Sequence, residues 1–169
     1  MTEATQQMVA LLPRLRRFAY ALTGSKADGD DLVQASCEKA LRALHQWTDG
    51  TRLDSWMYRI MQNAWIDHKR TQSRRAVPVA LDQITELVGR DGRDDMDSRL
   101  TLDKVRRAMT ELPKDQGIVL ALVTVEGLSY QETADVLELP IGTVMSRLAR
   151  GRKRLLGMVG TDQPPQTVR

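Results

Sequence analysis

The sequence predicts an all-α protein made of two small helical domains joined by a flexible linker, with a helix-turn-helix in the C-terminal domain. Three observations predict this fold. Apolar residues recur at helical spacing along most of the chain, and no segment alternates as a strand does. An acidic stretch with two glycines interrupts this pattern near the middle. Near the C-terminal end, a capped helix, a short turn and a basic helix follow one another.

Length and composition limit the possible functions. A chain of 169 residues can form one medium domain or two small ones, and its formal net charge is only +3. The single cysteine, Cys37, permits no internal disulfide, which suits a reducing cytoplasm. The N-terminus lacks the basic start and apolar run of a signal peptide, and the longest apolar run, 118–123, is too short to span a bilayer. We therefore expect a cytoplasmic protein without membrane insertion.

Two helices are expected at the start of the first domain, over residues 8–22 and about 27–44. The first carries an apolar stripe at helical spacing that is made of Val9, Leu12, Leu15 and Ala19. A Thr-Gly-Ser sequence at 23–25 ends it, and the acids just before Leu32 favour a new helix start through the helix dipole. Cys37 falls on the apolar side of the second helix, so we expect a buried thiol.

A loop over residues 46–52, with an Asp-Gly turn at its centre, leads into a long third helix. The apolar side of this helix is predicted to hold Met57, Ile60, Met61, Ala64 and His68. Arg59, Asn63 and Arg70 share a different face, and Trp56 lies near the edge of that face.

Aromatic residues cluster around this loop and helix at Trp47, Trp56, Tyr58 and Trp65. Aromatic rings beside cations suit single-stranded DNA, because any base can stack on a ring while the backbone meets Lys or Arg. The alternative, at least as good for Trp56 and Trp65, is that the rings form the core of a small domain. Basic residues continue to Arg75, so the first domain is predicted over 1–75.

Residues 76–97 are predicted to form an acidic, flexible linker. Between Asp82 and Asp97 there are six acids and two arginines, with two glycines and little apolar periodicity. The second domain is expected over 98–157, and the tail over 158–169, with its Pro-Pro pair, is expected to be disordered. The second domain starts with a helix over 98–112, and Pro113 separates it from a mostly buried helix over 114–126.

Residues 127–137, G-L-S-Y-Q-E-T-A-D-V-L, are predicted to form the first helix of the helix-turn-helix. Ser129 and Glu132 have the spacing of a capping box, in which the serine oxygen accepts from the Glu132 N–H and the glutamate accepts from the Ser129 N–H. Pro140 ends this helix and Gly142 lies at the start of the next. In that second helix an apolar stripe recurs at Val144, Leu148 and Leu155.

The second helix also carries a separate polar and basic face. Between Arg147 and Arg154 there are five basic residues and no acidic one. Such a helix suits the major groove of DNA. Residues near its N-terminal end, Thr143, Ser146 and Arg147, would reach base edges, and phosphates would be met by Arg150, Lys153 and Arg154. The alternative is a solvated basic face on an ordinary helical hairpin.

This unit, G-L-S-Y-Q-E-T-A-D-V-L followed by P-I-G-T-V-M-S-R-L, resembles region 4 of a bacterial extracytoplasmic-function (ECF, group IV) sigma factor of the sigma-70 family. Residues 111–116, E-L-P-K-D-Q, are similar to the entry of region 4. Residues 30–44, D-D-L-V-Q-A-S-C-E-K-A-L-R-A-L, are similar to the region 2.2 helix. The resemblance covers about residues 8–157 and implies region 2 in the first domain and region 4 in the second.

The resemblance also implies functional residues. In the family, region 4 binds the promoter's minus-35 element. Asp31 and Gln34 match positions that dock on the polymerase clamp, although Ala35 stands where the family usually has glutamate and Cys37 where it usually has phenylalanine. Residues 47–54 match the segment that grips a base flipped from the minus-10 element, with Asn63 beside it. The candidate minus-10 residues are Trp47, Thr48, Asp49, Gly50, Thr51, Arg52, Trp56, Arg59, Asn63, Lys69 and Arg70.

The implied partners are core RNA polymerase, promoter DNA and an anti-sigma protein, in a stress or envelope response. We expect neither an enzyme nor a cofactor, because no phosphate-binding glycine motif occurs and His45, His68 and Cys37 lack metal-site spacing. One alternative is an autonomous, dimeric helix-turn-helix regulator, which leaves the aromatic basic segment unexplained. A second is a sigma-like decoy for an anti-sigma protein, although decoys usually carry a receiver domain and this chain shows none.

Overall fold

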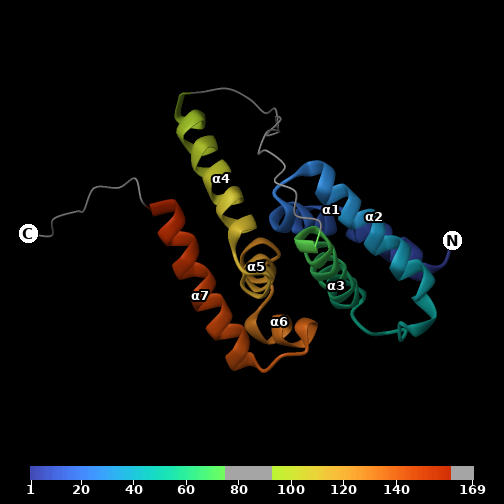
Figure 1. Ribbon diagram of the computed structural model, residues 1–169. Coiled ribbons are helices and arrows are strands. Elements are labelled where there is room, and N and C mark those ends of the chain that lie inside the picture. Colours follow the sequence, from blue (N-terminus) through green and yellow to red (C-terminus); the bar gives the residue numbers. More distant parts are fainter. Residues whose placement is uncertain (75–92, 161–169) are drawn as a thin grey trace, which may run out of the picture.

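The computed structural model describes residues 1–74 and 93–160, which form helices and no strand (Figure 1). The N-terminal half contains α1 (Glu3–Thr23), α2 (Lys26–Arg42), a short 3-10 helix η1 (Leu44–Gln46) and α3 (Leu53–Arg74). The C-terminal half contains α4 (Arg93–Glu111), α5 (Lys114–Leu120), a π-helical turn η2 (Ala121–Val125), α6 (Tyr130–Leu137) and α7 (Ile141–Val159). The predicted all-α class is confirmed.

The first three helices form a small bundle around aromatic and aliphatic side chains. Gly24 takes a left-handed conformation with φ of 68°, and its N–H donates to the Tyr20 carbonyl, so α1 ends there. Ser25 then caps α2 by accepting from the Asp28 N–H. At the centre of the bundle, the Phe18 and Tyr58 rings meet edge to face with centroids 5.2 Å apart.

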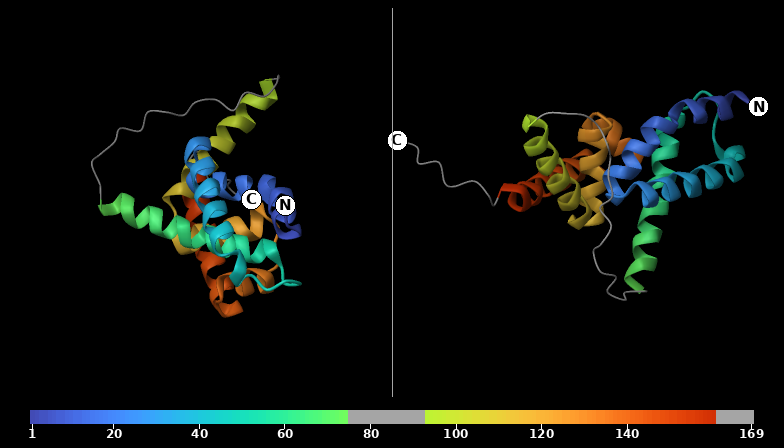
Figure 2. Two further views of the ribbon diagram at one scale, coloured as in Figure 1. Left: turned by 90° about the vertical axis from the view of Figure 1, so that its right-hand side faces the viewer. Right: turned by 90° about the horizontal axis from the view of Figure 1, so that it is seen from above.

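Three expectations about burial in this bundle need correction. Val9 is 53% exposed, because it lies about 120° around α1 from the buried Leu15. His68 is exposed and stacks on Trp65, since the last turns of α3 extend past α1 and α2 (Figure 2). Cys37 is only half-buried, although burial still raises the pKa of its thiol. Trp65, by contrast, belongs to the buried core.

The boundaries of the second half also differ from the prediction. Helix α4 begins at Arg93, inside the linker predicted over 76–97. Several of the acids that suggested a linker fall in the first turns of α4, where the helix dipole favours negative charge. Helix α7 likewise runs to Val159, into the predicted tail. Residues 76–92 of the linker and 161–169 of the tail lie outside the described residues.

The two halves pack against each other. Helix α1 contacts α4 and η2, and α3 contacts α6 (Figures 1 and 2). The buried apolar residues form one cluster that includes Phe18 and Met57 from the N-terminal half and Leu122 and Val136 from the C-terminal half. The sequence pattern did not predict this contact, because a hydrophobic period shows that a helix has an apolar face and does not identify its partner.

Candidate nucleic-acid interface

Helices α6 and α7 form the predicted helix-turn-helix. The Glu132 N–H donates to Ser129 Oγ at 3.0 Å, and the Ser129 N–H donates to Glu132 Oε2 at 2.7 Å, which completes the capping box at the start of α6. At the other end of α6, Glu138 takes a left-handed conformation with φ of 55°. The Leu139 N–H then donates to the Ala134 carbonyl at 3.0 Å, and α7 begins at Ile141.

One side of α7 is fixed against the C-terminal half. Val144 and Leu148 are buried, and Leu155 is half-buried, as the apolar stripe predicted. Gly151 is also buried, and a Cβ at this position would lie 3.4 Å from the Gln116 side chain of α5, so the two helices are close here. The close approach of α7 to α5 thus fixes the rotation of α7 about its axis, and with it the direction of the opposite, polar face.

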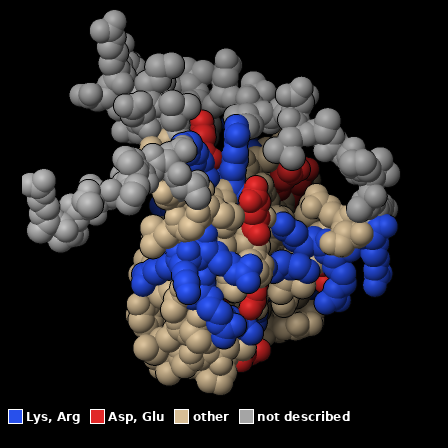
Figure 3. Space-filling model, turned by 60° about the vertical axis from the view of Figure 1, so that its left-hand side comes forward, with Lys and Arg blue, Asp and Glu red and all other residues tan. Residues whose placement is uncertain are grey.

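The six residues predicted to contact the minus-35 element are spread over that polar face, with Arg147 at its edge beside α5. Arg150, Lys153 and Arg154 are exposed, and basic side chains gather over α7 (Figure 3). Ser146 Oγ donates to the Thr143 carbonyl at 3.1 Å and accepts from Arg150 at 3.5 Å. This cluster of cations on one exposed helix face can meet the phosphates of a duplex.

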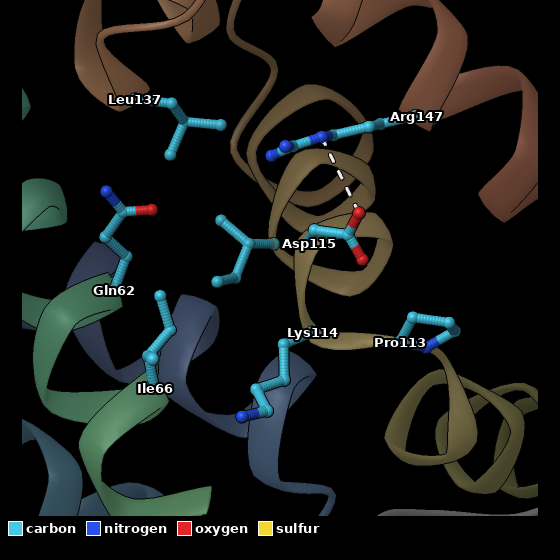
Figure 4. Close-up of a pocket in the computed structure, with 8 residues that line it drawn as sticks. Gln62, Ile66, Pro113, Lys114, Asp115, Leu137 and Arg147 are labelled. Atoms are coloured by element: carbon cyan, nitrogen blue, oxygen red, sulfur yellow. Dashed lines mark ion pairs between the residues drawn. The ribbon is translucent and has the colours of Figure 1, made fainter. Parts of the chain in front are cut away.

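Arg147 differs from the other cations because it is half-buried and forms an ion pair. Its Nε lies 3.6 Å from Oδ2 of Asp115, at the start of α5. The pair lies at an open groove of about 440 Å³ where Gln62 and Ile66 of α3 face Ile118 and Leu137 of the C-terminal half (Figure 4). Asp115 was not among the predicted site residues; the available signal was an acidic side chain at the second position of a predicted, mostly buried helix.

The loop before α3 has a defined conformation. The N–H and the Oγ1 of Thr51 both donate to the Thr48 carbonyl, at 3.1 and 2.6 Å. Gly50 has φ of 82°, which suits the third position of such a turn. The indole Nε1 of Trp47 is buried and has no hydrogen-bond partner in the described part of the chain. The predicted loop is therefore a tight turn anchored by a half-buried ring.

Arg52 connects this loop to both halves. It donates to both carboxylate oxygens of Asp54, at 3.1 and 2.9 Å, and to Glu132 of α6 at 2.7 Å. Burial raises the pKa of the Asp54 carboxyl, but the hydrogen bonds from Arg52 and the Ser55 N–H outweigh it and leave the pKa below its usual value. The hydrogen bonds to Asp54 and Glu132 raise the pKa of the Arg52 guanidinium.

Arg59 also contacts the C-terminal half. Its guanidinium donates to the carbonyls of Asp135 and Val136, at 3.0 and 3.1 Å, and lies 3.2 Å from Glu138. Both carbonyls lie at the C-terminal end of α6, where the carbonyl groups and the helix dipole attract a cation. Two of the predicted minus-10 cations, Arg52 and Arg59, are therefore engaged by α6.

The other predicted minus-10 residues are spread along α3. Asn63 and Arg70 are exposed on the face that Arg59 shares, and Trp56 is half-buried. The Lys69 ammonium lies 5.0 Å from the Trp65 ring centroid and donates to the Thr110 carbonyl at 3.3 Å. Burial, with a smaller effect of Lys114, lowers the pKa of Lys69. From Arg52 to Arg70 the helical rise gives a length of about 27 Å, so this set forms a strip and not a pocket.

Two further results concern other expected sites. Asp31 and Gln34, predicted to bind polymerase, are exposed on α2, where Gln34 donates to Glu38 at 3.4 Å. No group of three His, Cys, Asp or Glu side chains in residues 1–74 and 93–160 could hold a metal ion. Over the same ranges, none of the helices has the length and apolar character needed to cross a membrane.

Comparison with known families matches both halves of the chain. Residues 8–75 match Sigma-70 region 2, and residues 102–155 match Sigma-70 region 4. The chain is 30% identical over 167 residues to the ECF RNA polymerase sigma factor EcfG of Rhodopseudomonas palustris, covering 96% of this chain and 91% of EcfG. It is 33% identical over 145 residues to the ECF sigma factor SigE of Mycolicibacterium smegmatis, covering 84% of this chain and 56% of SigE.

The fold is also similar to solved structures. The sigma factor RpoE of Bartonella quintana, crystallised in complex with the anti-sigma factor NepR, superposes with a TM-score of 0.75. Its sequence is 27% identical, and the match covers 94% of this chain and 98% of RpoE. The similarity therefore extends over both halves and not over one helix-turn-helix alone.

Proposed function

Because the chain belongs to the sigma-70 family, in its extracytoplasmic-function group, we propose that it binds core RNA polymerase, directs it to specific promoters and initiates transcription there. The observation that carries this function is the presence of region 2 and region 4 in one chain, in that order. A regulator that only bound an operator would use the helix-turn-helix and leave region 2 without a role.

The C-terminal half is proposed to read the minus-35 element with α7. Thr143, Ser146 and Arg147 would contact bases in the major groove, since they lie in the N-terminal turns of the helix. The exposed Arg150, Lys153 and Arg154 would contact phosphates. Asp115 would orient Arg147 through its ion pair.

The N-terminal half is proposed to hold an unpaired base of the minus-10 element and to dock on polymerase. The turn at 48–51 and the neighbouring Asn63 would receive the base, and the cations along α3 would follow the DNA backbone. Asp31 and Gln34 are proposed to contact the polymerase clamp, which agrees with their exposure on α2.

Regulation by an anti-sigma protein is the third part of the proposal. RpoE, which resembles this chain over both halves, was crystallised with such a protein. We infer a cytoplasmic initiation factor without catalytic activity or cofactor of its own, serving a stress or envelope response.

Run-off transcription tests this function. Purified chain is mixed with core RNA polymerase and a library of promoter-length templates, and transcripts are mapped. We expect transcripts from a small set of templates only when the chain is present. No transcript from any template, with specific duplex binding by the chain alone, would favour the autonomous dimeric regulator.

A further inference from the structure

Glu126 is an acidic residue enclosed at the contact between the two halves. It directly follows η2, yet its carboxylate contacts side chains of the N-terminal half. Its two carboxylate oxygens accept from Arg17 Nε and Nη2 at 3.0 and 3.1 Å, and one of them also accepts from the Tyr58 hydroxyl at 2.6 Å. Arg14 Nε lies 3.6 Å away. The Glu126 side chain is 0% exposed, so these groups replace the water that a carboxylate needs.

The π-helical turn η2 places this carboxylate. The Glu126 N–H donates to the Ala121 carbonyl at 3.1 Å, five residues back, in place of the α-helical partner four residues back. The wider turn rotates the end of the α5–η2 segment relative to a continuous α-helix. Glu126 therefore meets Arg17 and Tyr58 while Leu122, in the same turn, stays in the apolar core.

The same contact engages two cations of the strip proposed to bind minus-10 DNA, although their side chains stay partly exposed, Arg52 at 52% and Arg59 at 36%. Arg52 pairs with Glu132, and Arg59 caps the C-terminal end of α6. The contact also leaves an open groove of about 440 Å³ between α3 and the C-terminal half. The closed arrangement thus depends on a few ionic contacts around an incompletely packed apolar surface.

We propose that Glu126, Arg14, Arg17 and Tyr58 form a latch that holds the free chain in a closed, autoinhibited form, and that this latch opens before promoter DNA is bound. This inference rests on the proposed function, because it assigns a regulatory role to the ionic contacts that engage Arg52 and Arg59. Opening returns Glu126 to water and releases both arginines together. The latch is thus a switch between two arrangements of the same folded halves.

The test compares charge reversals inside and outside the latch. Arg42→Cys and Gly157→Cys, in a Cys37→Ala background, place one spin label on an exposed residue of each half. Glu126→Arg puts a cation between Arg14 and Arg17, and Arg17→Glu puts two acids together. Asp103→Arg is the matched control, because Asp103 lies on the surface and pairs with Arg106 of its own helix. Circular dichroism verifies that every variant is folded.

Arg42 and Gly157 lie near the far ends of α2 and α7 (Figure 1), so we expect a single narrow distribution of label distances in the parent chain and in Asp103→Arg, and a shifted, broader one on opening. The Glu126 side chain is enclosed and Arg17 is 53% exposed, so placing like charges in contact here should lower the closed-to-open ratio by about tenfold or more in Glu126→Arg and Arg17→Glu. Combining the two reversals should restore part of the closed population. An unchanged distance in a folded Glu126→Arg chain would overturn the latch, as would a parent chain that is already open.

A binding measurement separates the latch from the proposed function. Free Arg17→Glu chain should bind a single-stranded minus-10 oligonucleotide at least about tenfold more tightly than the parent chain, since Arg52 and Arg59 would no longer be paired with groups of α6. A shifted label distance without tighter binding would overturn the autoinhibitory role. Failure of every variant to support run-off transcription would refute the proposed function and leave the conformational result intact.

Discussion

Arg147 and Lys153 occupy the same helix and have different surroundings. Arg147 is half-buried and held by Asp115, which reduces the number of conformations available to its guanidinium. Lys153 is exposed, and its flexible chain ends in a point charge. An oriented guanidinium suits bidentate contact with a base, whereas a mobile ammonium suits contact with phosphate.

We predict that Arg147→Ala lowers discrimination at one position of the minus-35 element by about 1–3 kcal/mol. Lys153→Ala serves as the comparison and should weaken binding to all sequences. It should also reduce the slope of the logarithm of the binding constant against the logarithm of salt concentration by about one. Holoenzyme binding to promoters with single substitutions in the minus-35 element, measured at several salt concentrations, distinguishes the two effects. Equal, sequence-independent losses in both variants would contradict the assigned roles.

The Asp54 carboxylate leads to a second prediction, about how the free energy of unfolding depends on pH. Its pKa is lower in the folded protein than in the unfolded chain, so its ionised form stabilises the fold. That stabilisation is complete above the unfolded pKa of about 3.9 and is lost as pH falls through the lower, folded value. Asp54→Asn should therefore reduce the free energy of unfolding at pH 7 by roughly 1 kcal/mol.

The difference between Asp54→Asn and the parent chain should shrink as the pH falls below about 4, where the parent carboxylate becomes protonated. Urea unfolding at a series of pH values measures it. Asp103→Asn is the control, because Asp103 belongs to an exposed pair whose loss should change the free energy of unfolding little. A pH-independent difference would show that Asp54 acts through packing alone.

At the scale of single elements, α6 depends on its N-terminal cap. It has only eight residues, and so short a helix is unstable by itself in water. The reciprocal hydrogen bonds of Ser129 and Glu132 satisfy two N–H groups that would otherwise lack partners. Packing against α7 and this cap together keep the helix-turn-helix in shape.

We predict that Ser129→Ala lowers the free energy of unfolding by about 1 kcal/mol and weakens minus-35 binding to a smaller extent. The matched control is Ser73→Ala, an exposed serine in the last turns of α3 that caps no helix. Denaturant unfolding of both variants gives the comparison. Equal stability of Ser129→Ala and the parent chain would show that packing alone maintains α6.

Local sequence signals predicted elements such as α6 well and their surroundings less well. The Ser129–Glu132 spacing and Pro140 identified both helices of the helix-turn-helix. The start of α4 was misplaced because acidic residues favour a linker and also favour a helix N-terminus. His68 was assigned to the core because periodicity does not reveal where a helix extends beyond its neighbours.

At the scale of the whole molecule, the contact between the halves could not be predicted from local patterns. Arg17 and Glu126 are 109 residues apart. From the sequence alone, each charged side chain could equally well be exposed to solvent. The same limit applies to Arg59, which was assigned to DNA from its place on α3 and contacts the end of α6 in the structure. Long-range pairing depends on how folded halves fit together, which periodicity does not encode.

This closed arrangement predicts that the free chain binds promoter duplex weakly, while the holoenzyme binds it tightly at the same moderate salt. In the free chain α6 engages Arg52 and Arg59, and the net charge of +3 gives little general attraction to DNA. Core polymerase would hold the two halves at a fixed separation, so that binding of one raises the effective concentration of the other. A gain of about a hundredfold or more is expected from this effect alone.

Fluorescence anisotropy with one labelled promoter, with a scrambled duplex as control, measures both affinities. Tight, sequence-specific binding by the chain alone would contradict the sigma mechanism and favour an autonomous regulator.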